Sequence, residues 1–266
     1  MKQGRAALLL LVVIFAAAIF APVLSPRDPT AQRLDSALAA PGSKGFLLGS
    51  DDLGRDILSR VLHGGRAALT VAGVSVGASL LFGSFLGLAA ALLGGRSEAF
   101  IMGLMNAILS FPTVLLAITV IAAFGNGLVQ VMGALAVVFT PVFARLVRAE
   151  VRSLKRRPFV LASQLLGASL RKVVRFHLLP MLLPRLLAQA ATTAALAIGI
   201  EASLSFLGLG TQPPTPSWGI MLKDARNYLI TAPWMAIAPG GAMAATIAAL
   251  HLLADGYSRR WAKRSE

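Results

Sequence analysis

The chain has 266 residues, of which 56% are hydrophobic and 14% are charged, and its formal net charge is +14. Soluble domains carry about 25% charged residues, so this composition excludes an ordinary soluble domain and indicates a surface that faces lipid. It also excludes a nucleic-acid-binding protein, because long stretches carry no charge and the basic residues gather in a few clusters.

Hydrophobic runs along the chain predict membrane-spanning helices, since a helix needs about 20 apolar residues to cross a bilayer. The first run is longer than the 7–15 residues usual in a signal peptide, so we expect it to be retained as a span. We predict an all-α, polytopic membrane helical bundle with six transmembrane helices, at residues 6–24, 67–93, 99–124, 128–144, 186–207 and 235–254.

Lys and Arg predict the orientation of these spans. With the N-terminus inside, 17 of the 25 Lys and Arg residues fall on the cytoplasmic side. The positive-inside rule therefore predicts that both termini are cytoplasmic. The expected divisions are an N-terminal transmembrane helix 1–25, a periplasmic segment 26–66, a five-helix core 67–254 and a cytoplasmic tail 255–266. The core includes a cytoplasmic loop 145–185 and a periplasmic loop 208–234.

The cytoplasmic loop is predicted to contain two short helices joined by a sharp turn. Pro158 suits a first helical position, Gly167 suits the left-handed position that ends a helix, and Ser169 can cap the next helix. Pro180 and Pro184 are expected to end the second helix and lead into the fifth span. The loop has ten basic residues and one acid, Glu150.

The second of these helices is predicted to be amphipathic, with Leu170, Val173, Val174, His177 and Leu178 on one face and Arg171, Lys172 and Arg175 on the other. Such a loop could rest on anionic lipid, which basic residues favour. It could also dock on a protein partner. The glycine turn between two short helices favours docking, because a lipid-resting helix needs no such turn.

This loop resembles the signature of binding-protein-dependent ABC permeases, which is Glu-Ala-Ala, three residues, Gly, nine residues, Ile, any residue, Leu-Pro. The matching positions are Leu161-Ala162-Ser163, Gly167 and His177-Leu178-Leu179-Pro180. Leu161 stands where the family has glutamate, and Ser163 stands where it has its second alanine. The resemblance implies docking through shape and basic charge, without that glutamate's contact.

Other segments extend the resemblance over nearly the whole chain. They are Leu48–Arg60, Ser110-Phe111-Pro112, Ala144–Arg148, Glu201–Gly210 and Gln212–Gly219. Together they are similar to the second permease subunit of the dipeptide, oligopeptide and nickel branch. Asn106 stands where the family usually has aspartate.

The resemblance implies a type I ABC importer permease fold in the bacterial cytoplasmic (inner) membrane, and half of a translocation path for peptides or related small solutes. Expected partners are a homologous second permease subunit, two ATPase subunits or domains, an extracytoplasmic solute-binding protein and the lipid membrane. It implies that the residues contacting the ATPase are Pro158, Leu161, Ala162, Ser163, Gly167, Ala168, Arg171, His177 and Pro180. We expect a gate or translocation path that includes Asn106, Pro112, Glu201 and Ser205.

Glu201 is expected within the fifth span, where a carboxylate costs about 2.5–3.5 kcal/mol on insertion scales. It either faces a cavity or partner, or anchors neighbouring helices through hydrogen bonds. Pro112 and Pro141 predict bends that are either static or hinges of a gate. The Gly-x-x-x-Gly pairs starting at Gly73 and Gly83 predict close helix packing or a sliding helix.

Sequence motifs for catalysis are missing from the chain. No glycine is followed directly by lysine, so there is no phosphate-binding Walker A loop, and we expect partner ATPase subunits to bind ATP and Mg. The chain has no cysteine, and its three histidines lack metal-ligand spacing, so no metal site is expected.

The alternative function is a secondary transporter or channel, with Glu201 as its one intramembrane acid.

Overall fold

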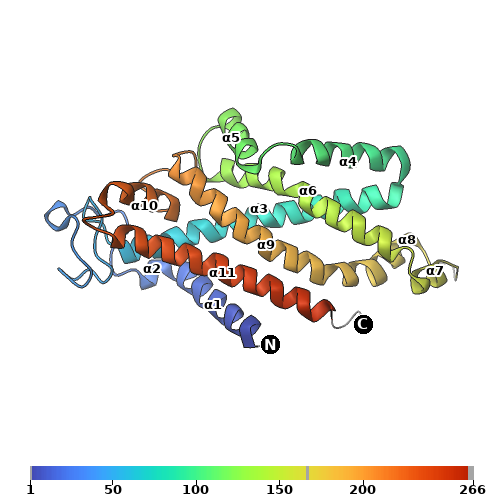
Figure 1. Cartoon of the computed structure of the whole chain (residues 1–266), viewed down its shortest axis with the longest axis horizontal. Coiled ribbons are helices and arrows are strands. Elements are labelled where there is room, and N and C mark those ends of the chain that lie inside the picture. The colour runs from blue at the N-terminus through green and yellow to red at the C-terminus, as the bar shows by residue number, and fades with distance from the viewer. Residues whose placement is uncertain (1, 166–167, 263–266) are drawn as a thin grey trace.

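The computed structural model describes residues 2–165 and 168–262, and Figure 1 shows these as helices and connecting loops. The helices, in chain order, are α1 (Lys2–Ile19), α2 (Ala21–Leu24), α3 (Ile57–Leu93), α4 (Gly95–Leu109), α5 (Thr113–Phe124), α6 (Leu128–Leu154), α7 (Pro158–Leu165), α8 (Leu170–Val173), α9 (Leu179–Phe206), α10 (Trp218–Ala225) and α11 (Trp234–Ala262). The predicted all-α class is confirmed.

The core of the bundle forms where α3 packs along α6 and α9, with α11 beside α9 and α1 (Figure 1). Gly83 and Gly87 allow the closest approach. A Cβ at Gly83 would lie 2.7 Å from the Cβ of Phe143, and one at Gly87 would lie 3.0 Å from the Cα of Ala144. Gly73 has open space around it, so only the second glycine pair serves packing within this chain.

Four helices among the described residues are long and apolar enough to cross a membrane: Ile57–Leu93, Leu128–Leu154, Val174–Phe206 and Trp234–Tyr257. The pair α4 and α5 passes the same test together, which allows a fifth span. Near the N-terminus, Ala6–Ile19 is a shorter apolar helix. The count of six spans therefore stays a prediction.

The bend that Pro112 predicts within the third span, 99–124, is confirmed. The chain bends by 93° between α4 and α5. The bend lies at Ser110–Pro112, and Pro112 is the N-cap of α5. It lies there because helical conformation is disfavoured for a residue that precedes proline. Pro141, in contrast, lies inside α6, which continues to Leu154, ten residues beyond the predicted end of the fourth span.

In the cytoplasmic loop 145–185, the second helix was predicted to end at Pro180 and Pro184, and this prediction is wrong. The helix that begins at Leu170 passes through one π turn, Val174–Leu178, into α9. In that turn the Leu179 N–H bonds to the Val174 carbonyl, five residues back. Pro180 lies at the start of α9, directly after this wider turn, and Pro184 lies inside α9. The fifth span is thus continuous with the loop.

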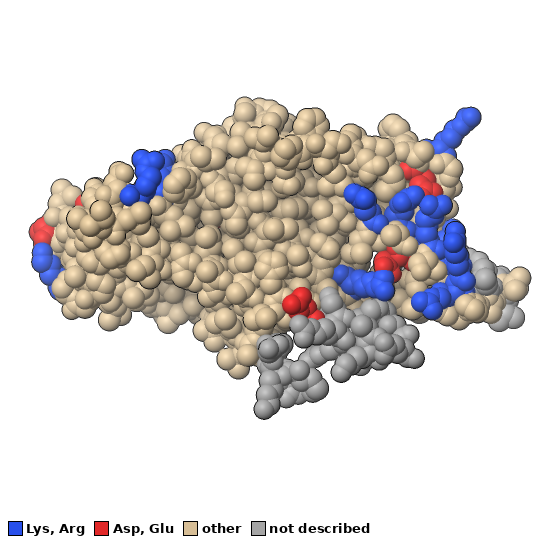
Figure 2. Space-filling view, viewed as in Figure 1, with Lys and Arg blue, Asp and Glu red and all other residues tan. Residues whose placement is uncertain are grey.

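The two ends of the bundle differ in charge. On the face shown in Figure 2, most Lys and Arg side chains gather at the end that carries α7 and α8. We call this the basic end, and we call the end formed by α2, α10 and residues 25–56 the α10 end. Between them lies a largely uncharged belt, as expected for lipid-facing surface.

Candidate coupling loop and gate

The predicted coupling loop forms an elbow at the basic end (Figure 1). Its first helix, α7, begins at Pro158 as predicted, and its second helix begins at Leu170, directly after Ser169. The Ala168 N–H donates to the Ser163 carbonyl at 3.0 Å. Gly167 lies outside the described residues, as do the side chains of Leu161 and Arg171, so their predicted roles stay predictions.

The elbow has the predicted apolar and basic faces where its side chains are described. Val173 and Leu178 are each 1% exposed, whereas Lys172 and Arg175 are exposed. The His177 ring lies 5.9 Å from the Phe159 ring of α7, so a ring contact joins the two arms of the elbow. Ala162 and Pro180 are exposed, and Ser163 and Ala168 are half-buried.

The helices that carry the elbow are tied together by ion pairs at the basic end. The Glu98 carboxylate of α4 accepts from Arg148 of α6 at 2.6 Å and lies 3.1 Å from Arg152. Glu150 of α6 pairs with Arg185 of α9. Because α6 leads into the elbow and α9 leads out of it, these pairs join the elbow to the bundle. Sequence reasoning assigned no role to Glu98.

The predicted gate residue Glu201 is fully buried in α9. Its Oε1 atom accepts from the Ser205 hydroxyl at 2.7 Å and from the Thr211 hydroxyl at 3.5 Å. Oε2 has no hydrogen-bond partner among the described residues. These bonds lie within α9 and between α9 and its own following loop, and they reach no other described helix. The choice between a cavity-facing role and an anchoring role for Glu201 stays a prediction.

Two glycines let this loop close over Glu201. A Cβ at Gly210 would lie 3.0 Å from the Ser205 Cα, and a Cβ at Gly219 would lie 2.8 Å from the Ala202 Cα. The Ser217 hydroxyl then caps α10 by accepting from the Ile220 N–H at 3.2 Å. The loop and α10 therefore pack directly on α9 at the α10 end.

Trp218 joins α10 to α3. Its indole N–H donates to the Val61 carbonyl at 3.0 Å, and its ring covers Gly64 and Gly65. The side chain is 2% exposed. Because a buried indole N–H needs an acceptor, this bond fixes the position of α10 between α3 and α9.

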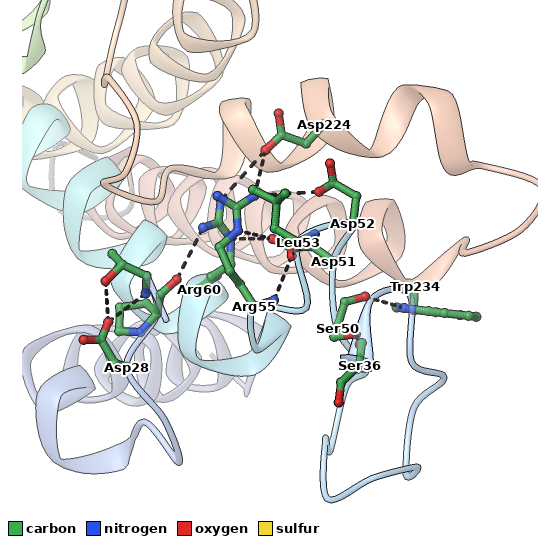
Figure 3. Close-up of polar contacts among 12 residues, drawn as sticks. Asp28, Ser36, Ser50, Asp51, Asp52, Leu53, Arg55, Arg60, Asp224 and Trp234 are labelled. Atoms are coloured by element: carbon green, nitrogen blue, oxygen red, sulfur yellow. Dashed lines mark hydrogen bonds and ion pairs between the residues drawn. The ribbon is translucent and has the colours of Figure 1, made fainter. Parts of the chain in front are cut away.

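A buried ionic network lies beside α10 (Figure 3). The Arg55 Nε lies 2.6 Å from Asp51 Oδ2, and the Arg60 Nε lies 3.4 Å from the same oxygen. Asp224 of α10 lies 3.5 Å from Arg55 and 3.9 Å from Arg60. Burial raises the pKa of Asp224, and the two arginines oppose that rise.

This network is the cluster that sequence reasoning missed. Sequence reasoning recognised residues 48–60 only as a family match. Four charged residues of the network lie within them, namely Asp51, Asp52, Arg55 and Arg60. A second contact ties the same loop to α11, since the Trp234 indole N–H donates to the Ser50 carbonyl at 3.2 Å (Figure 3). The network thus joins the segment before α3 to α10, and Trp234 joins it to α11.

The other predicted gate residues lie apart from Glu201 and Ser205. Asn106 is exposed on α4, and Pro112 is exposed at the bend before α5. Within the described parts of the chain, no hydrogen bond or ion pair connects either residue to Glu201 or Ser205. Their place in a translocation path stays a prediction.

Comparison with known proteins identifies the chain's relatives. Residues 79–263 match the family described as binding-protein-dependent transport system inner membrane component, and residues 2–41 match the N-terminal TM domain of oligopeptide transport permease C. The di/tripeptide transport system permease protein DppC of Pseudomonas aeruginosa is 40% identical over 96% of this chain and 86% of its own length. The glutathione transport system permease protein GsiD of Pectobacterium atrosepticum is 38% identical over 94% of this chain and 83% of its own.

Among solved structures, the inward-facing MetNI methionine ABC transporter has the same fold, with a TM-score of 0.61 at 20% identity. The match covers 76% of this chain and 95% of that chain. A second crystal form of that transporter matches with a TM-score of 0.59. The predicted type I ABC importer permease fold is confirmed. The chain therefore belongs to the family of binding-protein-dependent transport system inner membrane components, as a multi-pass permease subunit of an ABC importer.

Proposed function

We propose that this permease forms half of a translocation path for short peptides, in a heterodimer with a homologous second permease subunit. Two ATPase subunits or domains drive the complex, and an extracytoplasmic solute-binding protein delivers the peptide. The observation that carries the proposal is the 40% identity, over 96% of the chain, to a di/tripeptide permease. This chain contributes no catalytic group, and ATP and Mg are held by the ATPase partners.

Coupling to ATP runs through the elbow of α7 and α8. The elbow lies between the end of α6 and the helix that continues into α9, so a displacement of the elbow moves both. The Glu98–Arg148 and Glu150–Arg185 pairs support this transmission, because they resist independent movement of α6. ATP binding shifts the population between two packings of the bundle, since the ATPase partners bind ATP more tightly in one of them.

The gate lies at the α10 end, where the loop after α9 closes over Glu201. Thr211 holds this loop to α9, because its hydroxyl donates to the Glu201 carboxylate and its N–H donates to the Ser205 hydroxyl. Opening the path at this end requires the loop and α10 to leave α9, which breaks these bonds. In the resting state the Glu201 contacts therefore favour the closed form.

Reconstitution with the co-expressed partners tests the proposal. Liposomes that contain the complete complex should accumulate labelled dipeptide or tripeptide only with ATP and the solute-binding protein present. The control replaces the phosphate-loop lysine of the ATPase with alanine and should abolish uptake. Uptake that persists without nucleotide and follows an ion gradient would instead support a secondary transporter. Uptake of nickel complexes but not peptides would overturn the peptide assignment.

A further inference from the structure

A stripe of small and polar residues runs along one side of α9. The helix packs on α3, α6 and α11, and Figure 1 shows it between α6 and α11. Five exposed or half-buried positions recur every three or four residues and therefore share one side of the helix. They are Gln189, Thr192, Leu196, Gly199 and Ser203. At 1.5 Å per residue, this α9 stripe is about 21 Å long.

The exposed surface of α3 has a different chemistry. The side chains of Val74, Leu81, Phe82 and Phe85 are between 52% and 71% exposed. Large apolar side chains of this kind suit contact with acyl chains. In the α9 stripe only Leu196 resembles them. Polar residues within a span are expected to face a water-filled cavity or other protein groups, so the α9 stripe does not have the character of lipid-facing surface.

Two hydroxyl groups of the α9 stripe keep the capacity to accept hydrogen bonds. The Thr192 hydroxyl donates to the Ala188 carbonyl at 3.2 Å, and the Ser203 hydroxyl donates to the Gly199 carbonyl at 2.8 Å. These bonds use the hydrogen of each hydroxyl and leave its oxygen able to accept from another donor. A Cβ at Gly199 would meet no neighbouring atom within 4 Å, so the space beside the helix is open there.

Gln189 adds an amide whose hydrogen-bonding capacity is only partly used. Its Nε2 donates to the Thr193 hydroxyl at 3.2 Å, and the amide oxygen bonds to no residue that the structure describes. An unpaired amide is costly in hydrocarbon, so this group favours water or a polar ligand. The α9 stripe consequently offers both donors and acceptors without a charge.

We infer that the α9 stripe lines the translocation path and forms hydrogen bonds with the backbone of the peptide in transit. A peptide backbone presents N–H donors and carbonyl acceptors, and neutral amide and hydroxyl groups can bond to both without selecting a side chain. Neutral hydrogen bonds are also weak enough to allow release, which passage along a path requires. The inference rests on the proposed function and gives it a contact surface separate from the buried Glu201.

Cysteine substitution tests whether the α9 stripe faces water, since the chain has no cysteine of its own. Thr192→Cys and Ser203→Cys are treated with a charged methanethiosulfonate reagent in the complete complex, in liposomes, during ATP turnover. The matched control is Phe82→Cys, because Phe82 is 65% exposed on the apolar surface of α3. The thiolate is the reactive form and needs water, so both stripe positions should react about 10-fold faster than the control. Transported dipeptide should slow their reaction.

Thr192→Val tests the contact with the peptide, because it keeps the shape of the side chain and removes the hydroxyl. Loss of one neutral hydrogen bond should lower kcat/KM for dipeptide uptake about 2- to 10-fold. The control is Thr70→Val, which removes an exposed hydroxyl of α3 that donates to the Arg66 carbonyl and lies outside the α9 stripe. The control should keep normal uptake, and the melting temperature of each complex measures any general loss of stability.

The outcomes separate the inference from the proposed function. Slow reaction at both stripe positions, equal to that at Phe82, would overturn the inference, since the stripe would then face lipid or the second permease. Fast reaction that no transported peptide slows would overturn the backbone contact. If the complex transports another solute, and only that solute slows the reaction, the proposed peptide function fails while the stripe still lines the path. Protection by peptide, with a selective effect of Thr192→Val, supports both.

Discussion

Glu98 of α4 and Arg148 of α6 lie 50 positions apart in the chain, yet two guanidinium nitrogens of Arg148 reach the same carboxylate oxygen at 2.6 Å. This pair lies between the bent α4–α5 pair and the helix that leads into the elbow. It therefore connects α4, which also carries Asn106, to the helix that leads into the coupling loop.

Arg148→Gln should weaken this connection. A hydrogen bond to a charged group contributes about 1.5–3 kcal/mol, so the variant should lose thermal stability and transport fewer peptides per ATP hydrolysed. Arg145→Gln is the control, because Arg145 lies on the same helix, is exposed and makes no described ion pair. Melting of the purified complex and the ratio of uptake to ATP hydrolysis measure the two effects. Equal behaviour of both variants would show that the Glu98 pair has no special part in coupling.

Replacement of Glu201 tests the anchor between α9 and its loop. Glu201→Gln keeps an oxygen that can accept from Ser205 and Thr211, so it should change transport little. Glu201→Leu removes that acceptor and leaves two hydroxyl groups without their partner, which should loosen the gate or hinder assembly. The measurements are uptake and basal ATPase rate in liposomes with the complete complex. If both variants match the parent protein, Glu201 takes no part in the gate.

Gly219→Ala tests the close approach of α10 to α9. The new methyl group would overlap the backbone of Ala202, and overpacking of this kind costs about 1–3 kcal/mol. Gly199→Ala on α9 is the matched control, because a Cβ there meets open space. Thermal unfolding in detergent should show a lower midpoint for Gly219→Ala only. Unchanged stability in both variants would contradict the packing described for α10.

The predicted orientation is open to labelling, since the chain has no cysteine of its own. A cysteine at Ala162, which is exposed on α7, should react with an impermeant reagent only from the cytoplasmic side and should crosslink to the ATPase. A cysteine at Leu47, which is 66% exposed at the α10 end, should react only from outside. The reverse pattern would overturn the orientation that the basic residues predict.

Asp224 should make stability depend on pH. Burial raises its pKa above the ordinary value of 3.8, so between that value and the raised pKa the folded protein binds more protons than the unfolded chain. The contribution of Asp224 to stability therefore falls as pH rises through this window. Asp224→Asn lacks this titration, so the parent's melting temperature should fall relative to the variant's as pH rises from 4. A constant difference would contradict the raised pKa.

Several features followed from sequence alone because they depend on local chemistry. Hydrophobic runs predicted the long spans, and Pro158 predicted the start of α7, since its missing N–H is harmless in a first turn. The motifs at Gly167 and Glu201–Gly219 pointed to the permease family that the comparisons show. Both kinds of signal lie in neighbouring residues and need no knowledge of distant contacts.

Tertiary structure decided what local chemistry left open. Pro112 lies between two helices, whereas α6 runs through Pro141, because a long helix packed along α3 can compensate for one missing N–H. Sequence placed Glu201 within a span, but its partners depend on how the loop after α9 folds back. The partners of Glu98 and Asp224 lie dozens of positions away, at Arg148 and at Arg55 and Arg60. Only the packing of distant helices and loops brings such charges together, since no local pattern encodes a pairing between distant segments.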